Sequence, residues 1–206
     1  MDDATFWNTE FTECPDCVDV PDQILGAEIR DLNPGFALDL GYGSGKNCLI
    51  LAELGWTVTG VDWADEAIRL ARNAAQARGL EVTFIEADTT KWSPTRPFDL
   101  VISTFALPGK EDSRRVLRTA VNALSPGGTL IIADWDRSMA NVWEFEAKDL
   151  ATQEEIAEQL AGLQVERLEV RRVEAFAKDD PRASSGTAAN VAFGRVARFV
   201  VTDAAM

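Results

Sequence analysis

Three glycines occupy alternate positions in the segment LDLGYGSGKN, residues 38–47, directly after an apolar run. Glycine lacks a Cβ atom, so such a turn lets a ligand lie against the backbone. Several classes of nucleotide ligand bind at Gly-rich turns between a strand and a helix. The flanking residues must therefore decide between these classes.

The flanking residues fit neither of the two common phosphate-binding motifs. A Walker loop requires G-x-x-x-x-G-K-[ST], but residue 40 is leucine and residue 47 is asparagine. A dinucleotide fingerprint requires a third glycine where Lys46 stands. Asp39 precedes the first glycine by two residues, and its carboxylate would repel a pyrophosphate but attract an ammonium group. The turn therefore favours a ligand that carries a positive charge.

Short apolar runs and helical patterns alternate along the chain around this turn. The runs 36–40, 57–62, 81–88, 98–104 and 128–135 are typical of strands. The intervening segments have helical spacing, and residues 64–79 place a row of alanines and Ile68 on one face. This alternation predicts an α/β fold with a doubly wound, mostly parallel sheet. Its strand ends would bring the polar residues together.

The last third of the chain predicts a different arrangement. Residues 152–162 indicate a helix that begins with a capping box of Thr152 and Glu155. Residues 163–176 and 190–203 are typical of long strands, and we expect them to form an antiparallel hairpin at one edge of a seven-stranded sheet. Before the first strand, residues 22–32 predict a helix, and FWNTEF is expected to be irregular.

Four motifs, in the expected order, resemble those of the class I S-adenosylmethionine-dependent methyltransferases. They are ALDLGYGSGKNCLILAELGWTVTGVDWADEAIRLAR, FIEADTTKW, PFDLVIST and ALSPGGTLIIAD, which together span about residues 34–135. LAELGWTVTGVDWADEAI and FWNTEF are most similar to the small tellurite-resistance and thiopurine type branch. The resemblance implies a Rossmann-like fold and methyl transfer from S-adenosyl-L-methionine to a small-molecule thiol, selenol, oxygen or nitrogen. S-adenosyl-L-homocysteine would be the product.

The resemblance also implies roles for the residues of the first two strand ends. Asp39 would bind the amino group of the cofactor, while Gly41 and Gly43 would let its methionine part lie on the backbone. Asp62 would hold the ribose hydroxyls. Tyr42 belongs to the same turn, and we expect its side chain to point outward, the alternative being a phenol near the sulfonium.

The remaining predicted contacts follow the second, third and fourth strands. Trp63 would lie beside the adenine, and Asp88 would accept a hydrogen bond from the adenine amino group, with Thr89 as a backbone donor. Ser103 and Thr104 would border the methyl group. The resemblance transfers no general base to this chain, so the catalytic residues stay open.

The composition of the chain limits the classes of partner and cofactor that we expect. The formal charge of −14 disfavours nucleic acid, and the absence of histidine excludes every mechanism that needs a histidine base. Three cysteines and no histidine predict no metal site, with Cys14 and Cys17 as free thiols and Cys48 as buried packing. No apolar run has the length of a membrane span and the N-terminus does not have the pattern of a targeting signal, so we expect a cytoplasmic protein.

The expected organisation is one domain over 1–206, with an N-terminal lid and helix segment (1–33), a cofactor-binding core (34–135) and a C-terminal helix and hairpin (136–206). Phe6, Trp7 or Phe11 is predicted to cover the pocket. Two other functions stay open. One is a protein that binds S-adenosylmethionine without methyl transfer, as a regulator or a cyclase, and the other is an NAD-dependent oxidoreductase.

Overall fold

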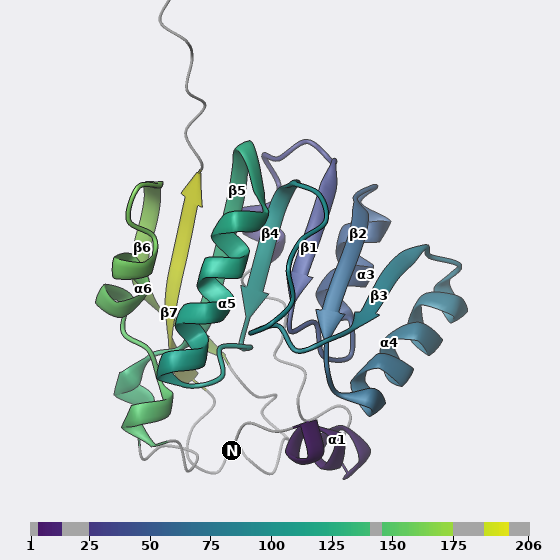
Figure 1. Ribbon diagram of the computed structural model, residues 1–206, viewed down its shortest axis with the longest axis horizontal. Coiled ribbons are helices and arrows are strands. Elements are labelled where there is room, and N and C mark those ends of the chain that lie inside the picture. Colours follow the sequence, from purple (N-terminus) through teal and green to yellow (C-terminus); the bar gives the residue numbers. More distant parts are fainter. Residues whose placement is uncertain (1–3, 14–24, 141–145, 175–187, 198–206) are drawn as a thin grey trace, which may run out of the picture.

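The computed structural model describes residues 4–13, 25–140, 146–174 and 188–197. Its strands are β1 (Phe36–Leu40), β2 (Thr57–Asp62), β3 (Val82–Glu86), β4 (Phe98–Thr104), β5 (Leu124–Trp135), β6 (Gln164–Glu174) and β7 (Ala188–Ala197). In the described chain they form one seven-stranded sheet in the order β3-β2-β1-β4-β5-β7-β6 (Figure 1). The first five strands are parallel, and β7 is antiparallel to both β5 and β6.

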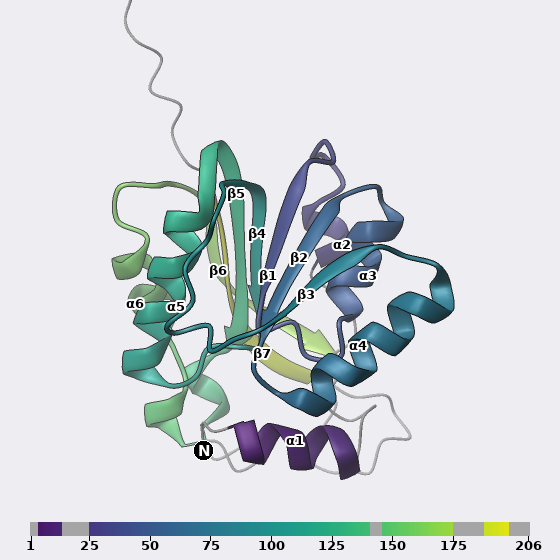
Figure 2. The same ribbon diagram turned by 45° about the vertical axis from the view of Figure 1, so that its right-hand side comes forward.

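Helices cover both faces of this sheet. On one face, α2 (Leu25–Glu28), α3 (Lys46–Glu53) and α4 (Asp65–Arg78) pack with their apolar residues on β1, β2 and β4. On the other face lie α5 (Lys110–Ala123) and α6 (Gln153–Gln159). Two short 3-10 helices, η1 (Arg137–Met139) and η2 (Ala147–Asp149), follow β5. The helix α1 (Ala4–Glu13) lies at the carboxyl ends of the parallel strands (Figure 2).

The main predictions about the fold are confirmed. All five predicted parallel strands are present, and the C-terminal hairpin forms one edge of the sheet, with β7 next to β5. The predicted face of α4 is buried, from Ala64 to Ala75. The capping box of α6 forms, because Thr152 accepts from the backbone N–H of Glu155 and the Glu155 carboxylate accepts from that of Thr152.

Four local predictions are wrong. FWNTEF belongs to α1, which is a regular helix whose Phe11 is buried against α4. Of the helix predicted over 22–32, the described residues are helical in α2, and the chain turns over residues 29–32. β3 ends at Glu86, two residues before the predicted end, and β5 begins at Leu124 instead of 128.

The strand order places the polar strand ends together. β1 is paired with β2 on one side and with β4 on the other. The chain therefore adds β2 and β3 on one side of β1 and then crosses back to add β4 and β5 on the other side. Open α/β sheets bind their ligands at such a switch point, outside the carboxyl ends of the strands. None of the helices that the structure describes has the length and apolarity that crossing a membrane requires.

Candidate functional site

The glycine turn joins the carboxyl end of β1 to the first turn of α3. Gly41 and Gly43 both have a positive φ, 76° and 54°, which favours glycine. They also have close neighbours: a Cβ atom on Gly41 would lie 2.4 Å from the Cβ atom of Ala106, and one on Gly43 would lie 3.2 Å from Cζ of Phe11. The turn therefore needs glycine both for its backbone angles and for its space.

The carboxyl group of Asp39 is buried beside this turn. Asp39 is 1% exposed, its Oδ2 accepts a hydrogen bond from the Cys48 thiol at 3.4 Å, and its Oδ1 has no hydrogen-bond partner among the described residues. Burial raises the pKa of Asp39 to about 7, the Cys48 thiol opposes this, and the negative charge of Asp62 adds to it. A buried oxygen without a donor fits a cationic group, because an ammonium would supply both a hydrogen bond and the opposite charge.

Asp62, at the carboxyl end of β2, connects the glycine turn to the start of α4. Its Oδ2 accepts from the backbone N–H of Gly43 at 2.9 Å, and its Oδ1 accepts from those of Trp63 and Ala64 at 2.7 and 3.0 Å. Burial raises the pKa of Asp62, while these three N–H groups lower it. A carboxylate has about four acceptor positions, so Asp62 keeps one for a hydroxyl. Its predicted contact with ribose stays a prediction.

The residues predicted for the adenine lie next to Asp62 in the chain or after β3. Trp63 is half-buried and packs in the cluster of Phe11 and Ala67. Asp88 lies in the turn after β3, where its carboxylate accepts from the Thr90 hydroxyl at 2.6 Å and pairs with Lys91 at 2.7 Å. Partial burial acts to raise the pKa of Asp88, but the hydrogen bonds from Lys91 and Thr90 outweigh it and lower the pKa. Thr89 lies in the same turn.

The two residues predicted at the methyl group end β4. Ser103 is fully buried, and within the part of the chain that the structure describes its hydroxyl has no hydrogen-bond partner. The Thr104 hydroxyl oxygen accepts from the side-chain amide of Asn47 at 2.8 Å. Asn47 belongs to the first turn of α3, and the sequence indicated it only as a mismatch to the Walker motif. Its position directly after the glycine turn could have indicated that it lies at the site.

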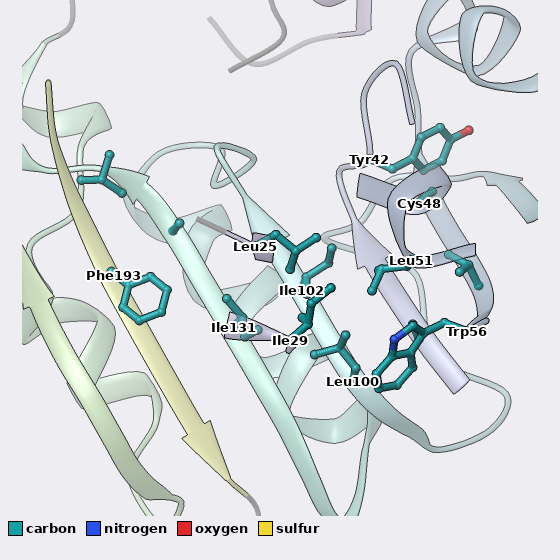
Figure 3. Close-up of a cluster of buried hydrophobic side chains, with 14 of the residues drawn as sticks. Leu25, Ile29, Tyr42, Cys48, Leu51, Trp56, Leu100, Ile102, Ile131 and Phe193 are labelled. Carbon is teal, nitrogen blue, oxygen red and sulfur yellow. The ribbon is translucent and has the colours of Figure 1, made fainter. Parts of the chain in front are cut away.

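The outward orientation expected for Tyr42 is wrong. Tyr42 is 5% exposed and belongs to a cluster of buried apolar side chains (Figure 3). The centroid of its ring lies 5.0 Å from that of Phe84. The space comes from Gly60, where a Cβ atom would lie 2.6 Å from the Tyr42 ring. Burial and the charge of Asp62 raise the pKa of Tyr42 above its usual range. Cys48 is fully buried, as predicted.

The helix α1 is attached to the same end of the sheet by two contacts. Phe11 lies against Gly43, and the Asn8 side chain accepts a hydrogen bond from the backbone N–H of Glu66 at 3.0 Å. The second contact caps α4, whose own N-cap residue Ala64 makes no side-chain cap. The predicted free thiols Cys14 and Cys17 lie outside the described residues.

Comparison with known proteins agrees with this geometry. Residues 37–128 match the model of a family described as "Methyltransferase domain". Residues 37–128 of the chain are therefore similar to a methyltransferase domain. The chain is 37% identical over 105 residues to a demethylmenaquinone methyltransferase of Thermus thermophilus. The matched region covers 50% of this chain and 48% of the relative. The chain thus spans about half the length of the curated relatives it matches. These similarities support S-adenosylmethionine as the cofactor.

Solved structures show the same fold. The PH0226 protein from Pyrococcus horikoshii superimposes with a TM-score of 0.69 over 92% of this chain and 98% of that chain, at 18% identity. The [4+2]-cyclase SpnF superimposes with a TM-score of 0.67 over 85% of this chain and 79% of that chain, at 21% identity. The fold that the chain shares with these structures therefore extends beyond residues 37–128, although the family model does not.

Proposed function

We propose that this protein transfers a methyl group from S-adenosylmethionine to a small-molecule nucleophile. The observation that carries the proposal is Asp39, a buried carboxyl group with a free oxygen beside a glycine turn. This environment suits the ammonium group of the cofactor and would disfavour the phosphates of a nucleotide. When bound, the cofactor supplies an electrophilic methyl group on a sulfonium.

The protein's own residues would bind the cofactor and exclude water from it. Gly41 and Gly43 give room for the methionine part, and Asp62 offers an acceptor for the ribose. The residues after β3, Asp88 and Thr89, would contact the adenine. Ser103 and Thr104 would lie nearest the methyl group, with Asn47 fixing the Thr104 hydroxyl. Holding the nucleophile, the methyl carbon and the sulfur in line is the main demand of this reaction.

The acceptor is proposed to be a small molecule. The Thermus relative is named for demethylmenaquinone, and the net charge of −14 opposes binding of a polyanion. Thiols and selenols need little base, which suits a chain without histidine. Acceptors of the tellurite-resistance and thiopurine branch stay a hypothesis, supported by the similarity of residues 51–68 and of FWNTEF to that branch.

Thermal unfolding tests the cofactor. S-adenosylmethionine or S-adenosylhomocysteine at about 100 times its dissociation constant should raise the melting temperature by roughly 5 to 10 °C. Asp62→Ala should bind roughly ten- to a hundredfold more weakly, because it loses the carboxylate that accepts from the ribose and from Gly43. Asp65→Ala removes an exposed carboxylate three residues later and should bind normally. A shift with NAD and none with either sulfur nucleoside would support the oxidoreductase instead.

A second candidate is a protein that binds the cofactor without methyl transfer. It is favoured by the structural likeness to a [4+2]-cyclase, because a shared fold does not fix the reaction. A panel of thiols, phenols and amines, analysed by mass spectrometry for a gain of one methyl group, separates the two. Cofactor binding without any methylated product would favour this second candidate.

A further inference from the structure

Asp134, near the carboxyl end of β5, is a buried carboxylate that the proposed function does not use. It is 8% exposed, its Oδ2 accepts from the backbone N–H of Leu107 at 2.9 Å, and its Oδ1 accepts from that of Trp135 at 2.7 Å. Burial raises the pKa of Asp134 to about 7, and the backbone N–H groups of Leu107, Trp135 and Ala106 oppose this rise. The carboxylate thus holds the backbone of two segments that are far apart in the sequence.

The loop that Asp134 holds joins β4 to α5 and consists of residues 105–109. Its first residue, Phe105, has a φ of 54°, and within the described chain it is the one residue other than glycine with a positive φ. This conformation persists only where the surroundings fix it. The Phe105 N–H donates to the carbonyl of Ala133 at 2.7 Å, and its ring packs 4.4 Å from that of Trp135. Phe105 is therefore held by Ala133 and Trp135, the two residues that flank Asp134 in the chain.

The same loop forms one wall of the glycine turn. Ala106 is the residue whose Cβ atom would lie 2.4 Å from a Cβ atom on Gly41. Because Gly41 has no Cβ atom, Ala106 can lie directly beside its backbone, and a shift of the loop away from the turn would widen the space beside Gly41. The place of Ala106 thus decides how wide the site is at the end of β1.

We propose that Asp134 is a positioning residue, which holds loop 105–109 against the glycine turn and so shapes the methionine end of the cofactor site. This inference rests on the proposed function, because it treats loop 105–109 as a wall of the S-adenosylmethionine site. Asp134 does not touch the reacting atoms. It acts through the backbone N–H groups of Ala106 and Leu107.

The test compares Asp134→Asn with Asp99→Asn as a matched control. Asp99 is also a carboxylate that accepts a backbone N–H, from Phe36 at 2.9 Å, and a hydroxyl hydrogen bond, from Ser125 at 3.0 Å, but it lies at the opposite end of the sheet. Asparagine has one acceptor oxygen instead of two, so one of the N–H groups held by Asp134 loses its partner. The dissociation constant of S-adenosylhomocysteine is measured by titration calorimetry, and hydrogen exchange is followed at Ala106 and Leu107.

Asp134→Asn should bind S-adenosylhomocysteine about tenfold more weakly, because the loop occupies its place in a smaller fraction of molecules. The amides of Ala106 and Leu107 should exchange about tenfold faster, with unchanged exchange in the interior of β4. Asp99→Asn should lower the melting temperature without either effect, which separates positioning from a general loss of stability.

Normal affinity in a folded Asp134→Asn protein would overturn the inference and leave the proposed function standing. A wild type that does not bind S-adenosylhomocysteine would overturn the proposed function and the inference with it. If Asp134→Asn does not fold, Asp134→Glu supplies the test, because it keeps both carboxylate oxygens but moves them by one methylene group away from the N–H groups of Ala106 and Leu107. Unchanged affinity and unchanged exchange at these two amides in a folded Asp134→Glu protein would contradict the role of Asp134.

Discussion

Replacing Asp39 by asparagine should make the protein more stable and weaken its binding of cofactor. The pKa of Asp39 is about 7 in the folded protein against 3.8 for a free aspartate, because burial and the negative charge of Asp62 raise it by more than the Cys48 hydrogen bond lowers it. The folded protein therefore holds a proton that the unfolded chain loses near pH 3.8. The stability that comes from this proton is fully present below pH 3.8, decreases as the pH rises to about 7, and is constant above that value.

The size of the effect follows from the two pKa values. Each pKa unit corresponds to 1.36 kcal/mol, so above pH 7 the ionisable group costs the folded state about 4 kcal/mol. Asparagine has no charge to bury, and its oxygen still accepts the Cys48 thiol. Asp39→Asn should thus be more stable by about 4 kcal/mol at pH 8 but by only about 2 kcal/mol at pH 5. For a chain of this size, 4 kcal/mol raises the melting temperature by roughly 8 to 16 °C.

The assay is thermal unfolding of wild type and Asp39→Asn at pH 5, 6, 7 and 8, with calorimetric titration of S-adenosylhomocysteine at pH 8. Asp99→Asn removes an exposed carboxylate on β4 and serves as the control, which should not reproduce the gain in stability. The neutral amide cannot compensate the ammonium charge, so the affinity of Asp39→Asn should fall while its stability rises. A stability difference that is the same at pH 5 and pH 8, or an Asp39→Asn protein that is less stable at pH 8, would refute the argument.

Three further outcomes are expected. Asn8→Ala removes the cap of α4 and should lower the free energy of unfolding by about 1 kcal/mol, measured by urea denaturation; an unchanged midpoint would contradict the capping role. Phe11→Ala should weaken S-adenosylhomocysteine binding more than Phe36→Ala does, since Phe11 lies against Gly43; equal effects in calorimetry would remove α1 from the site. Duplex DNA should not bind at micromolar concentration in physiological salt, and a fluorescence anisotropy titration that saturates there would show otherwise.

The sheet and the strand-end residues were predictable because they depend on local patterns. Buried parallel strands appear as apolar runs, and a βαβ unit places the residue that ends each strand at the same edge. Asp39 and Asp62 follow from this rule without any knowledge of contacts. Their spacing from the glycines fixes where they lie, so the sequence alone was enough to select them.

The contacts that shape the site were not predictable, because each depends on a residue distant in the chain. Tyr42 turns inward because Gly60 on β2 leaves space for its ring. Asn8 caps a helix that begins 57 residues later. Asp134 accepts a hydrogen bond from the backbone N–H of Leu107, and a backbone contact cannot be predicted from the type of the donor's side chain. The helix α1 was missed because its polar and aromatic residues do not show a clear helical period.

The most direct test of the account is a crystal structure of the protein with S-adenosylhomocysteine. The account predicts the nucleoside at the carboxyl ends of β1, β2 and β4, with its ammonium group hydrogen-bonded to Asp39 and a ribose hydroxyl to Asp62. Electron density for the nucleoside at another place on the sheet, or an Asp39 carboxyl that stays without a cationic partner in the complex, would contradict it.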